Sequence, residues 1–350
     1  MKKVIVFALL FGVFTGSAFA QLTLSGSFYA GVQIDIPYAS DEGRYRENEV
    51  QHAVNPLHRR EGAPVFNFAA TFNRPNGGAR LDTSFQADLT GDDPVTLNGI
   101  YGWVDFLNND LRFTLGRISS PLWVASLDPD HEWYFDKITG FRLEYRTPLP
   151  GLTVGAAFRT EGGTAAQLFE RIIVGANFLH PMFSAVFAYN VGANGHALLG
   201  VSFFGIPDLS LGVQLRARNI ASWDHPGLGG SFEMVQRAAF RVMRPLEVSL
   251  LAGQIFYAEP RGEGFERRDA ELFFTPGVSY RIRPDLTASF AVEVRSSDLF
   301  DQSRLITLNP ALDYQVNDRI AFYAEYELRL ARYMHQSFHR IGIGINIRAF

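Results

Sequence analysis

The chain has 350 residues, a formal net charge of −4 at pH 7 and no cysteine. The lack of cysteine excludes disulfides, thiolate metal sites and a lipid-anchored cysteine. Beyond the first three residues the chain keeps one lysine, Lys137, and its other cations are arginines, whose planar fork suits carboxylates and phosphates.

The first twenty residues have the pattern of an export signal. Lys2 and Lys3 precede an apolar run at 4–13, and Ala18-Phe19-Ala20 is a small-x-small cleavage site, so the mature chain is expected to begin at Gln21. A membrane anchor is the competing interpretation, but a bilayer-spanning helix needs about 20 apolar residues. The sequence therefore predicts a signal peptide at 1–20 and an exported mature domain at 21–350.

From residue 21 onward, apolar and polar residues alternate along short segments, as they do on β-strands with two different faces. The clearest example is the hairpin at 304–330, which turns at Asn317-Asp318. Its apolar positions are Ile306, Leu308, Pro310, Leu312, Tyr314, Val316, Ile320, Phe322, Ala324, Tyr326, Leu328 and Leu330. The pattern recurs along nearly the whole chain, which indicates a different solvent on each side of the sheet.

The alternation predicts eighteen strands, with sixteen as the alternative if weak strands near residues 97 and 195 are miscounted. The expected spans are 21–34, 63–73, 79–89, 97–107, 110–118, 139–147, 151–160, 168–179, 182–191, 195–206, 208–221, 230–243, 245–258, 269–283, 285–296, 303–316, 318–330 and 336–350.

Short turns alternate with longer polar connections between these strands. The turns are rich in Pro, Gly, Asn and Asp, which favour tight reversals, and the longest connections include 37–62 and 119–138. Short turns on one rim and long loops on the other are typical of a transmembrane antiparallel β-barrel, an all-β fold. The barrel must be closed, because unpaired backbone groups in lipid are costly. Aromatic girdles are expected from Trp103, Tyr145, Tyr189, Tyr257, Tyr280 and Tyr326.

Side chains alternate between the two faces of a strand, so odd and even positions face opposite sides, which we call their parity. Positions that face inward by parity carry many charges. The inward arginines are 80, 112, 142, 146, 159, 171, 216, 218, 237, 241, 281, 283, 295, 319, 329, 340 and 348, and the inward acids are 82, 88, 105, 144, 233, 247, 293, 313, 325 and 327. A barrel of this size leaves an aqueous channel, and unmatched charges belong in water. We therefore expect a wet lumen with more arginine than acid on its wall.

The connection at 119–138 holds four carboxylates, Asp128, Asp130, Glu132 and Asp136, together with several apolar residues. If it folds into the lumen, its apolar side chains could pack on the wall while its acids face arginines, giving a transverse field. If it lies on the surface, its acids are simply solvated. Composition alone leaves both interpretations open.

The central part of the chain resembles the Gram-negative general porins over residues 98–160. The resemblance rests on 101–106 (YGWVDF), 111–117 (LRFTLGR), 140–148 (GFRLEYRTP) and 151–159 (GLTVGAAFR). In that family a strand ending Thr-Leu-Gly-Arg precedes an inward-folded constriction loop.

The resemblance implies a constriction formed by Asp128, Asp130, Glu132 and Asp136, opposite a basic wall on which Arg142 and Arg80 are the best candidates. It also implies homotrimers. The basic wall residues are expected to be Arg80, Arg112, Arg142, Arg146, Arg159, Arg216 and Arg237.

The chain departs from the general-porin pattern in three places. Asp128-Pro129-Asp130 replaces the usual Pro-Glu-Phe-Gly loop tip, and a count of eighteen strands is closer to substrate-selective channels. Phe350 is the expected terminal aromatic read by the barrel assembly machinery, but Ile341, Ile343, Ile345 and Ile347 are out of phase with it, so a bulge or an inward Phe350 is required.

The expected function is passive diffusion of small hydrophilic solutes or ions through a charged pore, with outer-membrane lipid around the barrel; a substrate-selective channel is the alternative. A barrel hydrolase would need His131 or another loop histidine, but no G-x-S-x-G motif accompanies them. Acids near His131 could bind a divalent cation, although such loop acids usually bind water. A surface adhesin is the remaining rival. We expect no enzyme activity, no cofactor or metal, and no nucleic-acid partner.

Overall fold

The computed structural model describes residues 21–37, 49–51, 53–55, 60–61, 65–86, 95–118, 138–160, 172–191, 195–220, 230–261, 268–296, 304–331 and 338–348. These residues are almost entirely β-strand. One 3₁₀ turn, η2 (Leu107–Asn109), lies between β7 and β8. Among the described residues, no helix has the length and apolar character to span a membrane.

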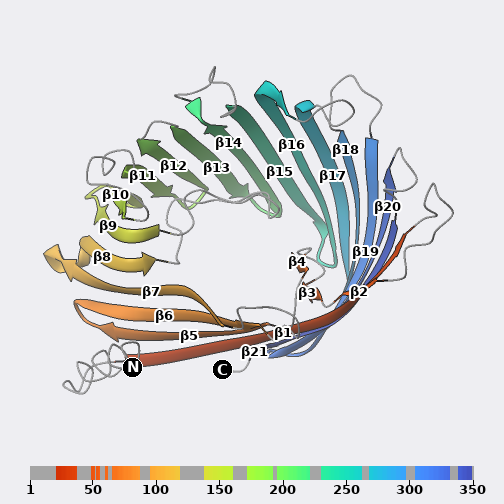
Figure 1. Cartoon of the computed structure of the whole chain (residues 1–350), viewed down its shortest axis with the longest axis horizontal. Coiled ribbons are helices and arrows are strands. Elements are labelled where there is room, and N and C mark those ends of the chain that lie inside the picture. The colour runs from red at the N-terminus through yellow and green to blue at the C-terminus, as the bar shows by residue number, and fades with distance from the viewer. Residues whose placement is uncertain are drawn as a thin grey trace.

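Eighteen long strands make one barrel (Figure 1). They are β1 (Gln21–Pro37), β5 (Val65–Arg74), β6 (Gly77–Gln86), β7 (Val95–Phe106), β8 (Leu111–Ile118), β9 (Ile138–Arg146), β10 (Leu152–Arg159), β11 (Ile172–Leu179), β12 (Phe183–Val191), β13 (His196–Ile206), β14 (Leu209–Arg218), β15 (Ser231–Met243), β16 (Leu246–Arg261), β17 (Arg268–Arg283), β18 (Leu286–Ser296), β19 (Arg304–Asn317), β20 (Ile320–Ala331) and β21 (Phe338–Arg348).

Each barrel strand from β5 to β21 pairs antiparallel with the next one along the chain, and β21 pairs with β1 to close the ring. The closing ladder runs without a register shift from Ser27 opposite Arg348 to Pro37 opposite Phe338. β1 is long enough for its first half to pair with β5 and its outer end with β2 (Glu49–Gln51). Closure pairs the backbone N–H and C=O groups of the two edge strands. A wall in contact with lipid requires this, because unpaired backbone groups there are costly.

The predicted count of eighteen is confirmed, and the alternative of sixteen is wrong. The two weak strands near residues 97 and 195 are β7 and β13, and both pair over most of their length with both neighbours. Sequence reasoning missed three short strands inside the long connection at 37–62. These are β2 and the separate hairpin of β3 (Ala53–Asn55) and β4 (Arg60–Glu61).

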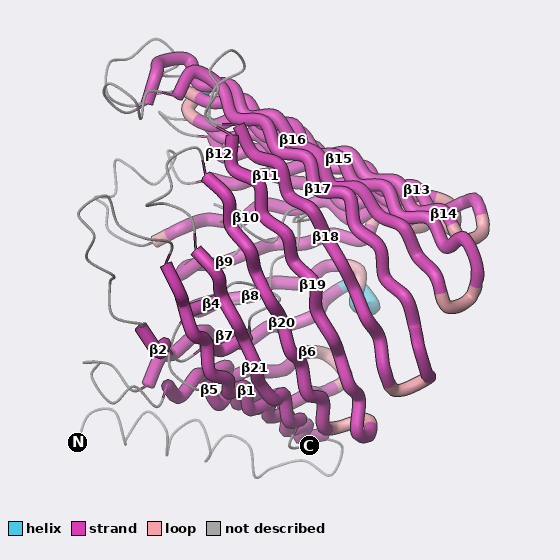
Figure 2. Tube along the Cα trace, turned by 90° about the vertical axis from the view of Figure 1, so that its right-hand side faces the viewer, coloured by secondary structure: helices cyan, strands magenta, loops and turns pink. Residues whose placement is uncertain are grey.

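The predicted short turns lie together at one end of the strands (Figure 2). The turn between β7 and β8 needs left-handed backbone, with φ of 51° to 74° at Leu107, Asn108 and Asn109. Asparagine adopts this region more readily than most residues. In the turn between β19 and β20, the Asn317 side chain accepts bonds from the backbone N–H groups of Arg319 and Ile320, at 2.8 and 3.0 Å.

The two predicted faces of the wall are confirmed by register and exposure. Cross-strand partners share a face, and the outward partners are exposed apolar residues such as Leu115, Leu143, Val201 and Val213. The isoleucines of β21 face outward, with Ile343 59% exposed. No bulge interrupts β21 over residues 338–348, and Phe350 lies outside the described residues.

Two aromatics expected in the girdles face the lumen instead. Trp103 shares the inward face with its partner Thr114, and the ring covers Gly78, its partner on β6. Tyr257 donates a hydrogen bond to the inward Glu271 at 2.8 Å. The girdle expectation is wrong at Trp103 and Tyr257 because it rested on their places near strand ends, whereas they have the same parity as the inward acids Asp105 and Glu247.

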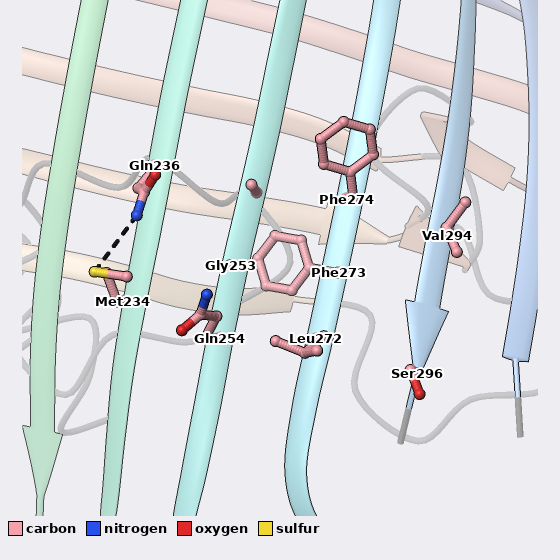
Figure 3. A pocket seen from close by; sticks show the side chains of 10 residues that line it. Met234, Gln236, Gly253, Gln254, Leu272, Phe273, Phe274, Val294 and Ser296 are labelled. Carbon is pink, nitrogen blue, oxygen red and sulfur yellow. Dashed lines mark hydrogen bonds between the residues drawn. The ribbon is translucent and has the colours of Figure 1, made fainter. Parts of the chain in front are cut away.

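In several strand pairs an aromatic ring on one strand lies over a glycine on the other. Tyr323 lies over Gly344 and Phe273 lies over Gly253 (Figure 3), and in each case the two residues are direct cross-strand partners. A Cβ at Gly344 would lie 1.9 Å from the Tyr323 hydroxyl oxygen, and a Cβ at Gly253 would lie 2.1 Å from the Phe273 ring. These rings therefore occupy the space that a side chain would need.

Gly344→Ala is expected to destabilise the barrel by about 1–3 kcal/mol, because overpacking forces side chains off their preferred rotamers or shifts the backbone. Gly102→Ala is the matched control, since its Cβ would meet only Gly78 O at 3.4 Å. Urea unfolding of both refolded variants, followed by tryptophan fluorescence, measures the difference. Equal midpoints for the two variants would contradict the packing argument.

Candidate functional site in the barrel lumen

Register places the predicted basic residues on the inward face. Arg80, Arg112 and Arg142 lie on β6, β8 and β9, and their cross-strand neighbours include Tyr101 and Glu144 on the same face. The polar halves of the alternating strands must face away from lipid, so they line the interior. The site is therefore a charged inner wall supplied by many strands.

The wall formed by β6–β9 carries three arginine–carboxylate pairs. Arg80 Nε lies 2.9 Å from Asp82 Oδ1, Arg112 Nε lies 2.7 Å from Asp105 Oδ1, and Arg142 Nε lies 2.9 Å from Glu144 Oε2. The first two arginines keep 41% and 39% of their side chains exposed, whereas Arg142 keeps 8%. Arg112 also lies over the Trp103 ring, 5.5 Å from its centroid.

Around the rest of the ring the pairs continue, and the pair of Arg216 with Glu233 is the most deeply buried of those in the described residues. Arg216 Nε donates to Glu233 Oε2 at 2.9 Å, and Arg216 Nη2 makes a second bond to the same oxygen. Both side chains are almost fully buried, at 3% and 5% exposed. Arg295 pairs with Glu293 at 3.1 Å and Arg340 with Glu327 at 3.7 Å.

These pairs correct one expectation. We predicted a wall of unmatched charges, but six inward arginines are paired with inward carboxylates. Sequence parity shows which face a charged residue is on. It cannot show whether an arginine and a carboxylate that are two residues apart, or on adjacent strands, will form an ion pair. Among the basic wall candidates, Arg146 and Arg237 are exposed and have no ion pair within the described ranges, and Arg159 is half-buried.

An apolar patch interrupts the charged wall on the inward face of β8–β13. It consists of Ile118, Ile138, Ala157, Ile173, Val186, Ala188 and Leu198, each 7% exposed or less, with Tyr101 packed against it. Ile118 and Ile138 are direct partners at the ends of β8 and β9. Sequence reasoning missed this patch, although Ile118 and Ile138 stand at inward parity beside the long connection.

Arg142 and Arg80 are expected opposite the loop acids. Arg142 lies on β9, next to Thr114 and Ala157, on the wall that bears the patch. The loop acids lie outside the described residues, so their place relative to these two arginines stays a prediction.

Several predicted residues lie outside the described part of the chain: Asp128, Asp130, Glu132, Asp136, His131, Asp88 and Arg171. Within that part, no group of three or more His, Cys, Asp or Glu side chains is placed to hold a metal ion.

The closed eighteen-stranded barrel with an apolar outside and a charged inside is a porin-type fold. No protein-family model matches the chain, and no curated protein matches it. Several solved structures do match the chain. An outer membrane channel, DcaP of Acinetobacter baumannii, is 11% identical, with a TM-score of 0.56 over 96% of this chain and 99% of that one.

Two further structures extend the likeness. A BenF-like porin from Pseudomonas fluorescens Pf-5 is 10% identical, with a TM-score of 0.64 and coverage of 94% and 98%. The outer membrane protein opdK from Pseudomonas aeruginosa is 9% identical, with a TM-score of 0.60 and the same coverage. At these identities the likeness establishes the fold, which is shared with outer-membrane porins and channels.

Proposed function

We propose that the protein is an outer-membrane porin through which small hydrophilic solutes and ions diffuse passively, after export and cleavage behind Ala20. The observation that carries this proposal is the closed barrel of eighteen strands with arginines and carboxylates on its inner face. A barrel of this width is too wide for wall side chains to fill. Pore transport, and not catalysis, is the proposed activity.

We further propose that the connection at 119–138 folds inward and narrows the pore. A water-filled lumen would wet its wall, yet the patch around Ile118 and Ile138 is almost fully buried. The connection leaves and re-enters the barrel at these two residues, and it carries Leu122, Trp123 and Trp133 as apolar partners. Packing them on the patch would stabilise an inward fold through burial of apolar area.

With its apolar residues on the wall, the connection would direct Asp128, Asp130, Glu132 and Asp136 toward the open lumen. Of the basic wall residues predicted from the sequence, the exposed Arg146 and Arg237 are then the candidates to act on solutes, because Arg80, Arg112, Arg142 and Arg216 are paired with carboxylates. Opposed charges across a narrow opening produce a transverse field that favours small polar solutes.

The experiment that tests the pore is single-channel recording of the purified protein in planar bilayers. We expect stepwise insertion events, each with a constant open conductance in KCl. Barrels that insert, as shown by protease protection, but remain electrically silent would overturn the proposal.

Asp130→Asn with Glu132→Gln is expected to shift ion selectivity toward anions, because it removes two negative charges from the narrowest part of the pore. The reversal potential in asymmetric KCl measures the shift. Asp208→Asn, on the turn rim and half-exposed, serves as the control. An unchanged reversal potential in the double variant would mean that the connection does not reach the conducting path.

A substrate-selective channel is the second candidate, and the strand count favours it. Eighteen strands differ from the sixteen of general porins. Liposome swelling with neutral sugars and with organic acids of equal size separates the two functions. Similar rates indicate a general porin, and a strong preference for one class indicates selectivity.

A further inference from the structure

The turn end of the lumen carries exposed arginines that have no carboxylate partner. Each lies at or near a turn: at the last residue of β9, near the end of β17, just before β20 and at the last residue of β21. They are Arg146, Arg281, Arg319 and Arg348, and none has an ion pair within the described ranges. The short turns lie together at one end of the barrel (Figure 2), so these cations share one mouth of the lumen.

Register places these arginines on the inner face of the wall. Arg281 is the partner of Thr287, which also pairs with the inward Asp313. Arg348 is the partner of Ser27 on β1, in the polar rows that face away from lipid. Phosphate groups of the surrounding lipid lie on the other side of the wall, so they cannot be the partners of these guanidinium groups.

Arg319 and Arg348 are direct neighbours on this face. The backbone N–H of Arg348 donates to the Arg319 carbonyl oxygen at 2.7 Å, and the next inward pair along the ladder is Ala321 with Asn346. Asp318 lies in the adjoining turn but forms no ion pair within the described ranges. Like charges opposite each other on a sheet are destabilising, and guanidinium groups suit anionic partners. The two arginines therefore attract small anions.

Farther into the lumen most arginines with known partners are neutralised. Arg216, Arg295 and Arg340 each pair with a carboxylate, and these carboxylates are no more than 8% exposed. Arg237 is an exception, since it is exposed and has no ion pair in the described part of the chain. Positive charge without a partner is therefore concentrated toward the turn end, which is the periplasmic end of an outer-membrane barrel.

We propose that this mouth is a site for small anions and that it makes conduction through the pore depend on direction. A voltage that drives anions in through the turn end also drives cations out toward it, where the arginines hold them back, so both ions accumulate in the lumen. The opposite voltage depletes the lumen of both ions. The inference rests on the proposed pore and adds to it a second element that selects solutes by charge.

The first test compares single-channel currents at equal and opposite voltages. In about 0.1 M KCl, where a charge acts over about 10 Å, the current should be roughly 1.5-fold larger at one polarity. In about 1 M KCl, where the range falls to about 3 Å, the two currents should become equal. Arg319→Gln with Arg348→Gln should remove most of the asymmetry and reduce the preference for chloride in reversal potentials.

Arg283→Gln is the matched control, because Arg283 lies at the same rim but on the lipid side. Parity predicts an inward Arg283, but the register shifts after Arg281, so Arg283 pairs with Leu286. Its guanidinium carbon lies 6.0 Å from the ring centroid of the outward Tyr314. The control should keep the asymmetry. Silent barrels would overturn the pore and this inference together, whereas conducting channels with equal currents at low salt would overturn this inference alone.

The second test uses the absence of cysteine from the chain, which lets one introduced thiol carry a chosen charge. In Arg348→Cys, a cationic methanethiosulfonate should restore the asymmetry and an anionic one should abolish or reverse it. Arg283→Cys treated in the same way should not respond. Identical currents after the two reagents at position 348 would show that this mouth does not act on the ions that pass.

Discussion

Arg216→Met is expected to destabilise the barrel by about 3–5 kcal/mol, because it leaves the Glu233 carboxylate buried without its cation. Arg216 and Glu233 are 3% and 5% exposed, and two hydrogen bonds join the guanidinium to one carboxylate oxygen. A charge removed from water in this way is strongly penalised unless its partner remains. The free energy of unfolding in urea measures the loss.

Two variants sharpen this prediction. Arg241→Met breaks a pair with Asp208 that is about half exposed and 3.4 Å long, so it should cost about 1 kcal/mol or less. Arg216→Met combined with Glu233→Leu removes both buried charges and should recover much of the stability lost by the single change. Equal losses for Arg216→Met and Arg241→Met would show that water reaches Glu233.

Deleting residues 121–136 is expected to increase the single-channel conductance roughly twofold, because the segment proposed to narrow the lumen is gone. The remaining residues, 119–120 and 137, can still bridge Ile118 and Ile138, which are direct partners. Planar bilayer recordings in KCl measure the change. The deletion also uncovers the apolar patch around Ile118 and Ile173, so binding of an apolar dye should increase.

A deletion of the connection at 222–229 provides the control for conductance. It shortens a different connection, between β14 and β15, and should change conductance less. Unchanged conductance after removal of 121–136, with the barrel still heat-modifiable on gels, would place the constriction elsewhere.

The sequence determined the barrel itself. Alternation of apolar and polar residues has a period of two on a strand, and lipid on one side and water on the other make both faces obligatory. The pattern therefore located all eighteen strands and their short turns, down to the weak strand β13 (His196–Ile206). It also placed Arg80, Arg142 and Arg216 on the inner face.

Only the tertiary structure decided what those inner residues do. Pairing between Arg216 and Glu233 depends on the register of β14 against β15, and the patch from Ile118 to Leu198 is assembled from one or two residues of each of the six consecutive strands β8–β13. Parity determines which face of the wall each residue is on. The register and curvature of the strands determine which residues become its neighbours, and no local pattern in the sequence specifies them.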